Sequence, residues 1–171
     1  MSATKPAEKA HTKDDQAPLR EQLIALLSGG QAHTTFDEAV KDLPVKLRGT
    51  VPPNLPYSAW QLLEHLRIAQ QDILDFSTNP KYQHRKWPEE YWPKSPAPPN
   101  ATAWNKSVRN FRAALKAIKA LVANRKTDLY AQIPWGTGQT ILREALLVAD
   151  HNAYHLAQLL DVRRLLGAWE K

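Results

Sequence analysis

The chain of 171 residues contains no cysteine, and this absence excludes several kinds of site. Disulfide frameworks, cysteine-ligated zinc, iron–sulfur clusters and cysteine nucleophiles all require a thiol side chain. A chain of this length buries roughly two thirds of its unfolded surface, so it needs neither a disulfide nor a structural metal in order to fold. We therefore expect any bound metal to have a functional and not a structural role. The absence of cysteine also makes a reducing cytoplasm the simplest expected location of the protein.

Long apolar runs are also missing. No apolar stretch approaches the ~18 residues that a transmembrane helix needs, so we expect no contact with a membrane. Residues 1–17 are small, polar and charged, and they lack the apolar core of a secretory signal. Because they offer too little apolar surface to offset the entropy of ordering, we predict a disordered tail over 1–17 and a single domain over 18–171.

No strand pattern and no internal repeat is present, and helical periodicity dominates instead. Apolar residues recur at spacings of three and four in four segments, within residues 19–43, 62–76, 104–122 and 141–166. This pattern predicts an all-α fold, a four-helix bundle. In the first segment Gly29 and Gly30 interrupt the pattern, so we expect a kink or a close approach of another element there, and His33 continues the buried face.

The helix over 62–76 has a clear start, and the connection that follows it is unusual. Ser58 and Gln61 have the spacing of a capping box, which predicts a helix that begins just after Ser58. Residues 80–103 are rich in proline and aromatic residues, too long for a turn and too apolar for a linker. We expect this segment to be a crossover between the second and third helices that packs over one end of the bundle.

Three histidines form the strongest chemical signal. His151 and His155 are four residues apart, so they lie on one helical face about one turn from each other. His65 lies on the inward face of the second predicted helix, where a facing helix can bring it to the same point. Three imidazoles leave coordination positions for water or substrate, which is typical of a catalytic metal site. The competing interpretation is that these residues are unrelated core or surface histidines.

Further residues are candidates for the same pocket. Glu144 lies seven residues before His151, on the same face, and is a candidate general base, although a carboxylate that complements the helix dipole explains it equally well. We expect His33, Trp87 and Trp92 to line the pocket. The pattern differs from a His-Glu-x-x-His protease because Asn152 stands where that motif has its glutamate. Zinc, nickel, copper and iron all accept imidazole ligands, and zinc and nickel are our first candidates.

At these histidines the sequence resembles a known family. Ser58-Ala-Trp-Gln-Leu-Leu-Glu-His65 and Asp150-His151-Asn-Ala-Tyr-His155-Leu-Ala-Gln158-Leu are similar to segments of the DinB/YfiT-like superfamily. This is the DNA-damage-inducible, metal-binding helical family and not the DNA polymerase that shares the name. The resemblance implies a four-helix bundle in up-down-down-up order, a divalent metal on His65, His151 and His155, and a homodimer. It further implies either metal-dependent hydrolysis or a thiol transferase reaction that uses a low-molecular-weight thiol such as mycothiol or bacillithiol.

Basic residues outnumber acidic ones, which supports a second hypothesis. The chain has 23 Lys and Arg against 17 Asp and Glu, and residues 91–127 contain eight basic and no acidic residues. The helix that begins near Trp104 therefore has a basic face that could bind a polyanion or a partner. A solvated helix face is the more common meaning of such a pattern, so nucleic acid is not our first expectation. A third hypothesis is a purely structural bundle with a vestigial histidine cluster.

Overall fold

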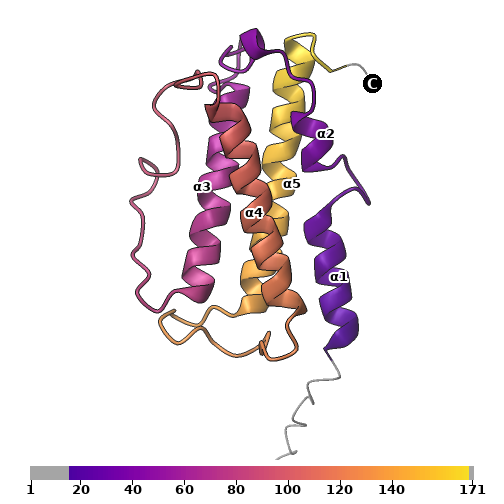
Figure 1. The fold of residues 1–171 in the computed structure, drawn as a ribbon, viewed down its shortest axis with the longest axis vertical. Helices are drawn as coiled ribbons and strands as arrows, with labels where there is room; N and C mark the ends of the chain where they lie inside the picture. The colour runs from indigo at the N-terminus through magenta and orange to yellow at the C-terminus, as the bar shows by residue number, and fades with distance from the viewer. Residues whose placement is uncertain (1–15, 170–171) are drawn as a thin grey trace, which may run out of the picture.

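The computed structural model describes residues 16–169, and its regular elements are helices (Figure 1). These are α1 (Ala17–Ser28), α2 (Phe36–Val40), the 3-10 helix η1 (Val45–Leu47), α3 (Ala59–Thr78), α4 (Ala103–Ala123) and α5 (Ile141–Leu165). The predicted all-α fold is confirmed. No helix in the described part of the chain combines the length and the apolar character needed to cross a bilayer.

The predicted N-terminal tail is largely outside the described residues, which begin at Gln16. The two tail residues that are described belong to the fold. Gln16 is buried, where its Oε1 accepts a hydrogen bond from Arg20, and α1 begins at Ala17. Arg20 thus holds Gln16 against the bundle, and the domain boundary itself remains a prediction, because residues 1–15 lie outside the described part of the chain.

The first predicted helix is two helices, so there are five α-helices in residues 16–169 instead of four. Gly29 and Gly30 have φ angles of 69° and 80°, in the left-handed region that favours glycine, and they end α1 where a kink was expected. The helix α2 begins after Thr35, which forms a capping box with Glu38. The prediction that His33 lies on a buried face is wrong, because the chain has left the helix there and His33 is exposed.

The helices α3, α4 and α5 lie side by side, and α1 packs against α4 and α5 (Figure 1). The start of α3 agrees with the sequence, because Ser58 and Gln61 form the predicted capping box. In Figure 1, α3 and α4 run in the same direction, so the chain between them has to return along the bundle. Residues 79–102, hereafter the crossover segment, do this along the flank of α3. The expectation that they would cap one end of the bundle is wrong.

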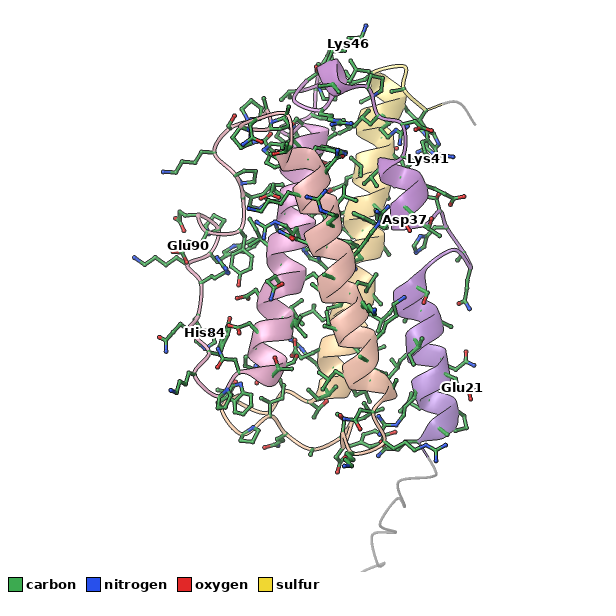
Figure 2. All side chains as sticks on the ribbon, in the orientation of Figure 1. Glu21, Asp37, Lys41, Lys46, His84 and Glu90 are labelled. Atoms are coloured by element: carbon green, nitrogen blue, oxygen red, sulfur yellow. The ribbon has the colours of Figure 1, made fainter. Side chains whose placement is uncertain are left out.

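Most charged side chains lie on the surface of the bundle, and apolar side chains fill its interior. Figure 2 shows Glu21 and Lys41 on the outer side of the N-terminal helices, and His84 and Glu90 on the crossover segment. The interior contains two apolar clusters. One includes Leu62, Phe111, Leu159 and Val162, and the other includes Phe76, Ile118, Val122 and Val148.

Buried polar side chains gather where the two clusters meet. On α5 the residues of one cluster end at Ala149 and those of the other begin at Leu156, and His151 and His155 lie between these limits. On the facing side of α3, His65 is only 2% exposed. Because an unpartnered polar group in an apolar interior costs free energy, a concentration of buried histidines at one level needs a chemical explanation.

Candidate metal centre

The three predicted ligands converge on one point. His65 comes from α3 and His151 and His155 come from α5, where their four-residue spacing places both rings on the same face. The His65 Nε2 atom is 3.1 Å from Nε2 of His155 and 3.1 Å from Nε2 of His151. Ligands at about 2.0–2.1 Å in a tetrahedral metal site have nitrogen atoms about 3.3 Å apart. The nitrogen spacing therefore fits a bound metal ion.

Hydrogen bonds to the outer ring nitrogens fix which nitrogen faces that point. Nδ1 of His65 is 3.0 Å from the carbonyl oxygen of Tyr91, and because a carbonyl only accepts, Nδ1 carries the proton. Nδ1 of His155 donates in the same way to Oε1 of Gln158 at 2.7 Å. Each neutral ring therefore turns an unprotonated Nε2 towards the other. Two facing lone pairs at this distance repel each other, and a cation between them removes the repulsion.

The environment also keeps the three rings neutral. Burial, opposed by the hydrogen bond to Tyr91 and aided by the charge of the neighbouring His155, lowers the pKa of His65 to about 4. Burial and the two other histidines lower the pKa of His151 to about 3, and burial lowers that of His155 as well. Metals bind the neutral form of imidazole, so at neutral pH the site is ready to bind without losing protons.

Aromatic rings of the crossover segment hold His65 in place. The Trp92 ring stacks on the His65 ring with centroids 3.9 Å apart and an angle of 5° between the planes. Trp87 lies further away, with its centroid 6.4 Å from that of His65. The stack and the bond to Tyr91 together restrict both the position and the rotation of the ring, which favours a defined ligand geometry.

A cavity of about 370 Å³ opens beside the three histidines. Its walls combine apolar side chains with a few polar ones. They include Ile73, Phe76, Tyr82, Trp87, Tyr91 and Leu147, together with Asp72, Gln139, Arg143 and Glu144. A cavity of this size, with an apolar lining and a few convergent polar groups, is typical of a small-molecule site.

Glu144 is the most deeply buried acid of this cavity, with 3% of its surface exposed. Its Oε1 accepts a hydrogen bond from Nη1 of Arg143 at 2.8 Å. Burial raises the pKa of Glu144 above its ordinary value, Arg143 opposes this, and the charge of Asp72 adds to it. The carboxyl group is thus shifted towards the range in which it can exchange protons near neutral pH.

The remaining candidates lie in different places. Trp87 lines the cavity as expected, whereas Trp92 packs on the back of His65. His33 lines a separate cavity of about 440 Å³ at the break between α1 and α2, next to Leu27 and Phe36. The structure therefore does not bring His33 to the three histidines, because α1 ends before it.

Sequence reasoning missed Asp72 and the contacts of Tyr91. Asp72 had a usable signal, because it lies seven residues after His65 and therefore on the same face of α3. The contact of Tyr91 with His65 had none, because it uses a backbone carbonyl that every residue possesses. No helical periodicity exists in the crossover segment from which that position could have been inferred.

Comparison with known proteins agrees with this geometry. A family model described as the DinB superfamily matches residues 30–159, which is more than half of the chain and includes the three histidines and Glu144. The chain belongs to the DinB superfamily. No curated protein and no solved structure matches it. The family predicted from the two histidine-bearing segments is therefore confirmed, and the DinB fold holds a buried three-histidine cluster that is compatible with metal binding.

Proposed function

We propose that this DinB protein is an enzyme that binds a divalent transition metal through His65, His151 and His155. The observation that carries the proposal is the 3.1 Å separation of the Nε2 atoms of His65 and His155, two rings whose Nδ1 atoms each face an acceptor oxygen. Each of these rings has its other nitrogen occupied by a hydrogen bond, so neither can supply a proton to relieve the contact while it is neutral. A set of three imidazoles fits zinc or nickel, our preferred candidates.

The reaction we propose is attack by a water or by a low-molecular-weight thiol on a small molecule, which means hydrolysis or thiol transfer. When bound, the metal supplies Lewis acidity that lowers the pKa of such a nucleophile. The three histidines hold the metal from one side, so the nucleophile and the substrate approach from the cavity.

Glu144 is the proposed proton acceptor. It is buried in the wall of the cavity that the three histidines also line, and its pKa is raised. Arg143 donates to Oε1, which leaves Oε2 to take the proton of the nucleophile and to return it to the leaving group. The exposed side chain of Arg143 also lies at the cavity, where its charge favours a substrate with an anionic group.

Metal titration of the metal-free protein tests the proposal. We expect Zn²⁺ or Ni²⁺ to bind to the wild-type chain at one ion per chain, measured by calorimetry. His65→Asn is the informative variant, because its Nδ2 can still donate to Tyr91 but it has no nitrogen at the Nε2 position. We expect it to lose binding, while His33→Asn, in the separate cavity, keeps it. Equal binding by all three proteins would refute the site.

A screen with the metal-loaded protein tests the reaction. Esters and amides test hydrolysis, and electrophiles offered together with small thiols test transfer. We expect turnover that requires the metal and that falls in Glu144→Gln. Metal binding without turnover in either screen would contradict the enzymatic part of the proposal and leave the metal site intact.

The basic helix supports an alternative function, binding of a polyanion or a partner protein. Lys106, Arg109 and Lys116 are exposed on α4. However, Arg112 forms an ion pair with Asp37 at 2.7 Å and Lys119 donates to Ser28, so contacts within the chain use part of the basic face. Binding of duplex or single-stranded DNA at low salt that is lost when the exposed residues are neutralised would favour this alternative. No binding at low salt would remove it.

The order of the helices and the assembly belong to the same proposal. When α1 and α2 are counted as one interrupted helix, the directions in Figure 1 support an up-down-down-up bundle. We further propose a homodimer, located in the cytoplasm, where small thiols are kept reduced. Light scattering of the purified protein tests the dimer, and a monomer at all concentrations would contradict it.

A further inference from the structure

One carboxylate on α3 contacts three residues of the crossover segment. Asp72 accepts a hydrogen bond from the hydroxyl of Tyr91 at 2.6 Å and one from the hydroxyl of Tyr82 at 3.1 Å. Nε of Arg85 lies 3.4 Å from its other oxygen. The Asp72 side chain is 11% exposed, so these contacts are largely shielded from water. Asp72 therefore fixes the middle of the crossover segment to α3.

The same part of the crossover segment contacts the candidate metal site. Tyr91 accepts the hydrogen bond from Nδ1 of His65 through its carbonyl oxygen, and Trp92 stacks on the His65 ring. Tyr91 is thus held at both ends, by its hydroxyl on Asp72 and by its carbonyl on His65. Since Asp72 follows His65 by seven residues, the two lie about 10 Å apart along one face of α3, and Tyr91 spans that distance.

We propose that Asp72 is a positioning residue which, through Tyr91, holds the carbonyl that orients His65 towards the metal. This inference rests on the proposed metal site. Its physical basis is that the carbonyl keeps the His65 proton on Nδ1 and the ring in one rotamer, and both are required for Nε2 to face the other two ligands. Partners that orient metal-bound histidines typically contribute 10- to 100-fold to metal affinity.

A carboxylate is needed for this role because three donors meet it. An ionised aspartate has two oxygens with about four acceptor sites, enough for two hydroxyls and a guanidinium. An asparagine in its place turns an NH₂ group towards Arg85 and presents a neutral oxygen to the two hydroxyls. Asp72→Asn therefore keeps the size of the side chain, but it loses the contact with Arg85 and weakens the hydrogen bonds from Tyr82 and Tyr91, which are charge-assisted in the wild type.

Titration with Co²⁺, followed by its visible absorbance, is the first test. We expect Asp72→Asn and Tyr91→Phe each to weaken Co²⁺ binding about 10-fold. We expect the double variant to be no weaker than either single one, because both changes break the same link. Asp75→Asn is the matched control. Asp75 lies on the same helix and accepts a hydrogen bond from Asn79, the first residue of the crossover segment, so its replacement leaves the contacts of Asp72 with Tyr82, Arg85 and Tyr91 in place.

A second measurement requires no metal. In the metal-free protein, the His65 Nδ1–H proton in NMR spectra reports directly on the bond to Tyr91. We expect this proton to be protected from solvent exchange in the wild type and in Asp75→Asn, and to exchange faster in Asp72→Asn and Tyr91→Phe. Tyr91→Phe removes a single oxygen atom, so it keeps the test available if Asp72→Asn fails to fold.

The outcomes separate this inference from the proposed function. Unchanged Co²⁺ affinity and an unchanged Nδ1–H signal in both variants would overturn the role of Asp72. Weaker binding with an unchanged signal would overturn it as well, because Asp72 would then act by another route. If the wild type binds no Co²⁺, the proposed function fails, and faster Nδ1–H exchange in the two variants still supports the link from Asp72 to His65.

Discussion

The metal that we propose connects α3 with α5, so it should stabilise the fold. His65 belongs to one helix and His151 and His155 to the other, and their Nε2 atoms meet only in the folded chain. The unfolded chain keeps at most the local pair His151 and His155, which binds metal weakly. Because the metal binds the folded state in preference, its addition shifts the unfolding equilibrium towards the folded protein.

The size of this effect follows from linkage. At a free metal concentration 100 times the dissociation constant, binding adds about 2.7 kcal/mol to the free energy of unfolding. In a chain of this length, each kcal/mol raises the unfolding temperature by roughly 2–4 °C. We therefore expect metal to raise the unfolding temperature of the wild type by about 5–10 °C relative to protein in a chelator.

Circular dichroism during heating, with and without metal, measures the shift. In His65→Asn, metal should raise the unfolding temperature by less than about 2 °C, because this variant keeps the donor to Tyr91 but lacks the third ligand. His33→Asn, whose side chain lies outside the metal cavity, should behave as the wild type does. The reasoning would be refuted by equal shifts in the wild type and His65→Asn, since the metal would then bind elsewhere.

Three further predictions follow from the same structure. Glu144→Gln should lower turnover about 100-fold with unchanged metal content, which steady-state kinetics and elemental analysis measure together; an unchanged turnover would remove Glu144 from the mechanism. The metal-free protein should become less stable to urea as the pH falls from 7 to 3. The pKa values of His65 and His151 are about 4 and about 3 in the folded chain and near 6.5 in the unfolded chain. The unfolded chain therefore binds protons first, and this shifts the equilibrium towards unfolding. A flat profile over that range would contradict the burial of these rings. Arg163→Met should cost about 3 kcal/mol of unfolding free energy, because the buried Arg163 donates to the carbonyls of Ala39, Lys41 and Ala168; a loss under about 1 kcal/mol would contradict this.

The sequence was sufficient to predict the helices that carry the site. Helical spacing placed His151 and His155 on one face of the last helix and His65 on the inward face of another, and the structure brings the three together. The capping box at Ser58 and Gln61 predicted the start of α3 correctly. These features depend on interactions between residues within one or two turns of a helix, and such interactions are visible as spacing in the sequence.

Features that depend on distant residues could not be predicted in this way. The crossover segment lies along α3 because Asp72 holds Tyr82 and Tyr91, and no spacing in the segment encodes that contact. The positive φ angles of Gly29 and Gly30 end α1, and with it the buried face that was expected to continue to His33. A glycine pair is compatible with either a kink or a helix end, and tertiary packing decides between them.

The metal content of the untagged protein shows whether the three histidines hold a metal ion. Elemental analysis should find close to one divalent transition metal ion per wild-type chain, either as purified or after reconstitution. The folded variant with His65, His151 and His155 all replaced by alanine should contain almost none. An equal metal content in the two proteins, or none in the wild type after reconstitution, would contradict a metal site at these histidines.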